Sequence, residues 1–163
     1  FAIQFARMMG CKVVATSSSR EKLDRLKTLG VDEVINYREH SDWGDVVNEL
    51  TGGKGANLVV EVGGSGTIAQ SVRAVSVGGI ISMIGVLTGF AGDVPLAELF
   101  QKNARIVGIT VGSKKDQKDM IAAVEANDLN PVMDKTFNLE NLADAFKLQE
   151  SQRHFGKIGV QIK

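Results

Sequence analysis

The stretch of residues 11–37 constrains the fold most, because it contains one complete strand–helix–strand unit. An apolar run at 13–14 predicts the first strand, and another at 34–35 predicts the second. Between them leucines recur at helical spacing, and Ser18 with Glu21 three residues later fits a capping box at the start of a helix. Ligands of parallel sheets bind beyond the carboxyl ends of the strands. The residues that close the first strand are therefore the first candidates for a ligand site.

The rest of the chain continues the same alternation of strands and helices. Strands are expected at 57–62, 80–86 and 105–111, and Gly78-Gly79 is expected to end the helix before the second of these. The nearly continuous apolar run at 57–62 is typical of a strand buried on both faces. This order predicts an α/β fold with a Rossmann-type, doubly wound parallel sheet.

Two features of the sequence bear on the domain organisation of the chain. From residue 129 the alternation gives way to one short strand, one helix and one closing strand, so we expect a domain boundary near 128. At the other end, Phe1, Phe5 and Met8 already share one helical face without a capping signal. We therefore expect a piece of a longer polypeptide of about 330–350 residues.

Composition and charge narrow the possible partners. Lys plus Arg equals Asp plus Glu at 19 each, which favours neither nucleic acid nor an anionic membrane as a partner. No apolar run approaches the ~20 residues that span a bilayer, and we expect a cytoplasmic protein. His40 and His154 are interpreted as surface histidines and Cys11 as a small packed residue. No metal site is expected in this chain.

The end of the first strand carries a charge pattern that bears on cofactor choice. Ser17 stands in a run of three serines, with Arg20 and Lys22 close behind. Hydroxyls and cations suit a ribose 2′-phosphate, which a carboxylate would repel. A capped helix start with solvated charges explains the same residues equally well, so both interpretations stay open.

Taken together, five stretches in this order resemble the medium-chain dehydrogenase/reductase superfamily, in its zinc-type alcohol dehydrogenase and quinone oxidoreductase group. The stretches are VVATSSSREKLDRLKTLGVDEVINY, TGGKGANLVVEVGG, GGIISMIGVLTG, KNARIVGITVGS and HFGKIGV. The resemblance implies that 1–128 is an incomplete NAD(P)-binding Rossmann domain without its first strand and glycine-rich loop. Because that strand is central in the family's sheet, we expect a gap beside the strand at 13–15. It also implies that 129–163 is the C-terminal return segment of the catalytic domain.

The same resemblance implies roles for residues at the adenosine end of the cofactor. Ser17 stands where NAD-using members carry an acidic residue, and Ser18 follows it. Lys22 would reach the ribose or its phosphate, Tyr37 would lie near the 2′-phosphate, and Lys157 would approach the pyrophosphate. The resemblance therefore favours NADP as the cofactor and leaves NAD possible.

The nicotinamide end would be formed by residues at the ends of three strands. These residues are Val62, Gly63, Gly64, Ile84, Gly85, Val86, Ile109, Thr110 and Val111. The resemblance places the first three beside the adenosine and the nicotinamide ribose, the next three against the nicotinamide ring, and the last three at its carboxamide.

The implied function is hydride transfer between NADP(H) and an alcohol, aldehyde, quinone or enone as the small-molecule substrate. Catalytic residues and any zinc ligands would lie upstream of Phe1, so none is assigned here. A homodimer through the edge strand Arg105–Val111 is expected. A nucleotide-binding regulatory or sensor module without catalysis is an open alternative. A methyltransferase would also alternate strands and helices, but Ser17 replaces the acid that it would need.

Overall fold

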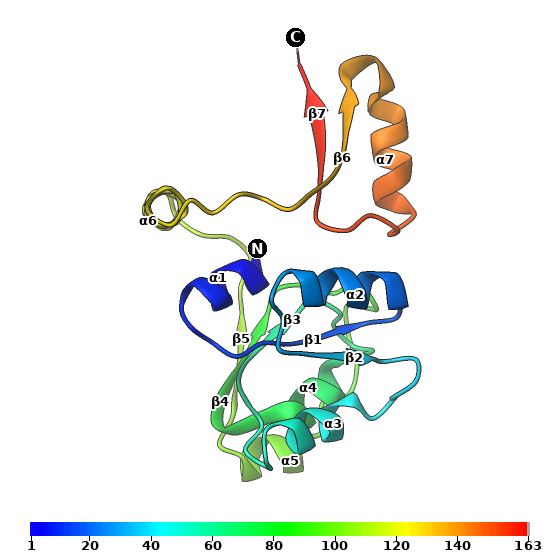
Figure 1. Ribbon diagram of the computed structural model, residues 1–163. Helices are drawn as coiled ribbons and strands as arrows, with labels where there is room; N and C mark the ends of the chain where they lie inside the picture. The colour runs from blue at the N-terminus through cyan, green and yellow to red at the C-terminus, as the bar shows by residue number, and fades with distance from the viewer. Residues whose placement is uncertain (163) are drawn as a thin grey trace.

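Strands alternate with helices along the chain in the computed structural model, which describes residues 1–162 (Figure 1). The elements in chain order are α1 (Ala2–Met8), β1 (Val14–Ser17), α2 (Arg20–Thr28), β2 (Glu33–Asn36), α3 (Trp43–Leu50), β3 (Ala56–Glu61), α4 (Ile68–Ala74), β4 (Val75–Met83), α5 (Leu96–Gln101), β5 (Arg105–Gly108), α6 (Lys114–Ala126), β6 (Met133–Asn138), the short 3₁₀ helix η1 (Leu139–Asn141), α7 (Leu142–Glu150) and β7 (Lys157–Gln161).

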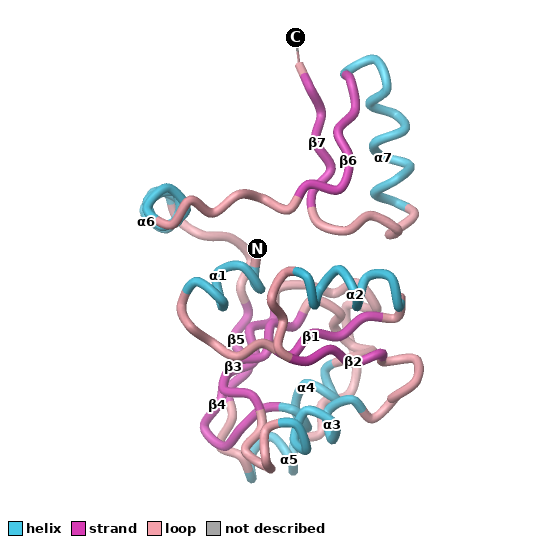
Figure 2. The backbone as a smooth tube through the Cα atoms, viewed as in Figure 1, coloured by secondary structure: helices cyan, strands magenta, loops and turns pink. Residues whose placement is uncertain are grey.

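The strands form three parallel groups: β1–β2, β3–β4–β5 and β6–β7. Figure 2 shows the first two groups in the lower part of the molecule, with helices above and below them. The parallel α/β architecture of the Rossmann type is confirmed. Among the described residues β1 pairs only with β2 and β3 only with β4. The sheet is therefore interrupted beside β1, where the sequence led us to expect a gap.

The start of α2 differs from the sequence prediction. Ser19, and not Ser18, is the N-cap, and its hydroxyl accepts a hydrogen bond from the Lys22 amide at 3.3 Å. The Ser19 amide in turn donates to Oγ of Ser17 at 3.3 Å. The predicted capping box is wrong because extended backbone continues through Ser19, so the helix begins one residue later.

The predicted ends of α4, β4 and β5 are also wrong. Helix α4 stops at Ala74, and β4 runs from Val75 through Gly78 and Gly79, which do not break a helix. Val75 is fully buried beside α4, so burial decides where the strand begins. Strands β4 and β5 end at Met83 and Gly108, which leaves residues 84–86 and 109–111 beyond the strands.

Strand β3 is not buried on both faces. Val59 packs against the core below α4, whereas Leu58 and Val60 on the opposite face are 57% and 42% exposed. Side chains alternate along a strand, so a face without a covering layer exposes every second residue. The expectation of a doubly buried strand is therefore wrong within the described part of the chain.

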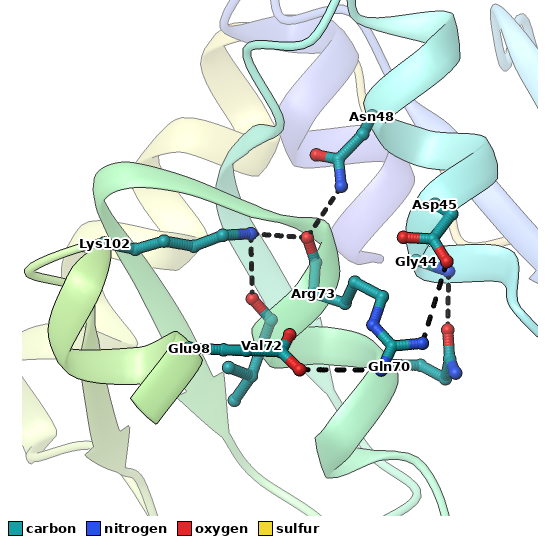
Figure 3. Close-up of polar contacts among 8 residues, drawn as sticks. All are labelled: Gly44, Asp45, Asn48, Gln70, Val72, Arg73, Glu98 and Lys102. Carbon is teal, nitrogen blue, oxygen red and sulfur yellow. Dashed lines mark hydrogen bonds and ion pairs between the residues drawn. The ribbon is translucent and has the colours of Figure 1, made fainter. Parts of the chain in front are cut away.

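At the amino end of β4 the chain is held by a single lysine (Figure 3). The Lys102 ammonium donates to the carbonyls of Val72, Arg73 and Val75 at 3.1, 2.5 and 2.8 Å. Asn48 of α3 adds a hydrogen bond to the Arg73 carbonyl at 2.9 Å. The last carbonyls of a helix have no partner inside it, so these donors satisfy the end of α4. Burial lowers the pKa of Lys102, an effect that Glu98 and Asp45 oppose.

The segment of β6, α7 and β7 lies apart from the first two sheets but contacts α2 (Figure 1). Arg25 donates to Asp134 at 2.8 Å and lies over the Phe155 ring, while Lys22 donates to the Gln152 carbonyl at 2.6 Å. Helix α6, which leads into this segment, has no buried residue. The domain boundary near residue 128 stays a prediction.

Candidate functional site

The segments that follow β3 and β4 are joined by backbone hydrogen bonds. The amides of Ile84 and Gly85 donate to the Glu61 carbonyl at 2.9 and 3.2 Å. The Thr88 amide donates to the Gly63 carbonyl at 2.7 Å, and the Thr88 hydroxyl donates to the same oxygen at 2.9 Å. The structure therefore brings residues 62–64 and 84–86 together, as the sequence predicted. We call residues 62–64, 84–86 and 109 the platform.

Two glycines allow this close approach. A Cβ atom at Gly85 would collide with the Val62 carbonyl oxygen. Gly64 has φ +92°, and a Cβ atom there would lie 2.8 Å from the Gly89 oxygen. Positive φ and lack of space both favour glycine. The role that the structure shows for these glycines is therefore to let the two segments pack closely against each other.

The outer surface of the platform is apolar. The Ile109 amide donates to the Met83 carbonyl at 2.9 Å, which joins the end of β5 to the end of β4. Four platform side chains are between 41% and 48% exposed: Val62, Ile84, Val86 and Ile109. Val111 is more exposed, and no hydrogen bond between described residues ties Thr110 or Val111 to the platform. The result is an open apolar surface rather than a deep pocket.

Glu61 is a residue of this region that our sequence interpretation missed. It is only 3% exposed, and its Oε1 accepts hydrogen bonds from the amides of Gly63 and Gly64 at 2.7 and 3.1 Å. The Thr67 hydroxyl donates to the same oxygen at 2.6 Å, and the Ser71 hydroxyl donates to Oε2. A single acid inside the apolar run NLVVEV is the signal that could have identified it, because buried charges require partners.

At the end of β1 the structure brings together some of the residues predicted for the adenosine end. The Tyr37 amide donates to the Ser17 carbonyl at 3.2 Å, so these two residues are neighbours. Within residues 1–162 the side chains of Ser18 and Tyr37 make no hydrogen bond, so both hydroxyls can donate to a ligand. The Lys22 ammonium is held by the Gln152 carbonyl.

Lys157 lies apart from the serines. Its ammonium is 5.4 Å from the centre of the Phe1 ring, and no described contact joins it to Ser17 or Lys22. The structure therefore groups Lys157 with α1, and its predicted contact with the pyrophosphate stays a prediction.

The remaining candidate residues do not form a metal site. The described residues contain no group of three or more His, Cys, Asp and Glu that could hold a metal ion. Cys11 is exposed, so its predicted packing is wrong. His154 is half-buried, with an Nδ1 that has no partner among residues 1–162, whereas we expected a surface residue.

No helix among the described residues is both long and apolar enough to cross a membrane.

Two surface hollows lie away from the platform. One is at the start of α6 between Gly112 and Met120, and the other is between α2, β2 and α3.

Comparison with known proteins gives consistent matches. The sequence profile of the family described as zinc-binding dehydrogenase matches residues 1–126. The zinc-type alcohol dehydrogenase-like protein of Schizosaccharomyces pombe is 41% identical over 167 residues, which cover 99% of this chain and 48% of that protein. The chain spans about half the length of the curated relatives that it matches.

Solved structures match over the same extent. The crystal structure of an NAD-dependent alcohol dehydrogenase has a TM-score of 0.89 and 39% identity, covering 99% of this chain and 47% of that one. A variant of a crotonyl-CoA carboxylase/reductase, solved in complex with NADP, has a TM-score of 0.89 and 25% identity, covering 99% and 46%.

Proposed function

Because the chain belongs to the zinc-binding dehydrogenase family, within the medium-chain dehydrogenase/reductase superfamily, we propose that it binds the nicotinamide cofactor of an oxidoreductase. The reaction is hydride transfer between NADP(H) and an alcohol, aldehyde, quinone or enone. Residues 1–128 form the incomplete cofactor domain, and residues 129–163 return to the catalytic domain.

The platform is the observation that carries this proposal. Its exposed side chains are apolar, and the polar backbone atoms of Gly63 are turned toward Glu61 and Thr88. A flat, weakly polar ring gains by covering such a surface, since about 25 cal/mol is gained per Å² of apolar area removed from water. The cofactor supplies the hydride when it is bound. The chain's own residues orient the ring and exclude water from one of its faces.

A binding and turnover experiment tests the proposal. The full-length protein is titrated with NADPH and NADH, and cofactor oxidation is then followed with aldehyde, quinone and enone substrates. Micromolar binding with turnover of one substrate class is the expected result. Binding without turnover of any class would favour the sensor module instead. Absence of binding to either cofactor would refute the proposal.

Preference for NADP(H) over NAD(H) is a finer part of the proposal. It rests on the free hydroxyls of Ser18 and Tyr37 beside Ser17, because hydroxyl donors suit a phosphate dianion. The solved relatives differ here, since one is named NAD-dependent and the other holds NADP. Ser17→Asp should reduce the NADPH-to-NADH affinity ratio roughly tenfold or more, because a carboxylate repels the phosphate. Ser17→Asn is the uncharged control. A parent protein that prefers NADH would contradict this part.

We also propose a homodimer through β5. All four residues of β5 are exposed, and β5 pairs only with β4 among the described strands. Such an edge favours pairing with a second copy by an isologous contact. Light scattering of the full-length protein should show a dimer, and Val107→Glu should shift it to monomer. A monomeric parent protein would exclude the dimer.

A further inference from the structure

We propose that Glu61 is a positioning residue for the nicotinamide end of the cofactor site, an inference that rests on the proposed function. Glu61 itself is buried, so its side chain is not part of the exposed surface of the platform. It acts through the two segments that form the platform.

Both segments depend on this one residue. The Glu61 carboxylate accepts the amides of Gly63 and Gly64, while its backbone carbonyl accepts the amides of Ile84 and Gly85. The Glu61 side chain therefore fixes the backbone path after β3, and the Glu61 carbonyl fixes the backbone path after β4. A change at Glu61 alters the spacing between the two halves of the platform.

The Glu61 carboxylate fixes the backbone conformation after β3 in addition to stabilising the fold. No described Lys or Arg pairs with Glu61, so hydrogen-bond donors alone stabilise its charge in the interior. Burying a charge is costly, and an apolar side chain of similar volume often stabilises a core equally well. An apolar side chain would leave two adjacent backbone amides without an acceptor, and the chain would have to turn differently. The carboxylate is the group that keeps these amides directed inward.

The inward direction of the amides determines what the platform presents outside. The Gly63 carbonyl is occupied by Thr88, and the Gly64 carbonyl by the amides of Thr67 and Ile68 at 3.0 and 2.9 Å. With these polar groups satisfied internally, the exposed surface consists of the side chains of Val62, Ile84 and Val86. Precise support of this kind is what a binding surface requires.

The test compares three variants of Glu61 in the full-length protein. Glu61→Gln keeps an oxygen for the two amides and Thr67, and its NH₂ group can donate to Ser71. It should bind NADPH within about threefold of the parent. Glu61→Asp keeps the charge but shortens the reach, and Glu61→Ala removes the acceptor. Both should weaken NADPH binding at least tenfold and raise KM for the cofactor more than they lower kcat.

Lys102→Met is the matched control, because it removes a polar clamp at the opposite end of the same sheet. It should lower the melting temperature and leave the dissociation constant for NADPH within twofold. Hydrogen exchange provides a second readout. Glu61→Asp should speed exchange at both 62–67 and 84–89, whereas Lys102→Met should speed exchange near 72–78.

The outcomes separate this inference from the proposed function. If Glu61→Asp binds NADPH like the parent, Glu61 is only a structural residue and the inference is overturned. If the parent binds no nicotinamide cofactor, the proposed function fails. Exchange at 62–67 and 84–89 then still shows whether Glu61 positions both segments. If Glu61→Ala does not fold, the contrast between Gln and Asp decides alone.

Discussion

The two ends of the β3–β4–β5 sheet are held by opposite charges. At the carboxyl ends, one buried anion, Glu61, accepts four hydrogen bonds from amides and hydroxyls. At the amino ends, one cation, Lys102, donates to three carbonyls at the end of α4 (Figure 3). Backbone amides without a partner are satisfied by an anionic acceptor, and carbonyls without a partner at a helix end are satisfied by a cationic donor. The sign of each charge follows from the backbone groups that it must satisfy.

The two ends differ in what they leave exposed. Around Lys102, helix α4 packs on β3 and β4 and is contacted by α3 and α5, and Arg73 bridges Asp45 and Glu98 at 3.6 and 3.5 Å. Around Glu61, polar groups are directed inward and apolar side chains stay exposed. The amino end therefore stabilises the fold, whereas the carboxyl end also has the exposed apolar surface that we propose as the cofactor site. Four predictions test this distinction, beginning with the largest expected effect.

Glu61→Ala should lower the free energy of unfolding by about 3 kcal/mol, because it leaves two buried amides without an acceptor. Urea denaturation monitored by circular dichroism measures the loss. Glu49→Ala, at an exposed position of α3, is the control and should change stability by less than about 0.5 kcal/mol. A loss at Glu61 as small as that of the control would mean that the amides find other partners.

Lys102→Met should cost roughly 1–3 kcal/mol, since it keeps the aliphatic stem but removes a charged donor to three carbonyls. The same denaturation experiment measures the effect. Lys54→Met, at an exposed lysine without a described hydrogen bond, should be nearly neutral. Equal stability of the two variants would show that water replaces the ammonium at the end of α4.

Arg73→Met should cost less than about 1 kcal/mol, because both of its ion pairs are partly exposed and longer than 3.4 Å. The small effect should decrease further in 0.5 M salt, because added ions shorten the Debye length and screen exposed charge pairs more strongly. A cost above that of Lys102→Met would reverse our ranking of buried and exposed charges at the amino end.

The smallest effect is expected at the contact between α2 and β6, and it should fade in acid. The hydrogen bond from Arg25 holds the pKa of Asp134 below its usual value of 3.8. The unfolded chain therefore binds the proton first as pH falls, so the stabilisation is complete above about pH 5 and is lost through the folded-state pKa.

Thermal unfolding of the parent and Asp134→Asn between pH 2 and 7 measures this dependence. The difference between the two proteins should shrink as the pH falls below 4. Asp144→Asn, in an exposed pair with Lys147 on α7, is the control. A difference for Asp134→Asn that does not vary with pH would contradict the assigned role of Arg25.

Local patterns in the sequence were sufficient for the order of the elements. The alternation of apolar runs and helical repeats predicted the parallel α/β fold. The interruption beside β1 was also predicted. The alternation depends on spacing within about ten residues, so a single sequence is enough to reveal it. The interruption was expected because the family resemblance lacks its first strand here.

Only the tertiary structure decided where the elements end and which polar groups are buried. Ser19 replaced Ser18 as a cap because of the backbone before α2, and Gly78 lies in a strand because Val75 is buried in the core. Lys102 donates to a carbonyl thirty residues away, and the Glu61 carboxylate meets a hydroxyl ten residues away across a turn. Partners of buried polar groups are chosen by how helices and strands pack, and no local pattern in the sequence encodes that choice.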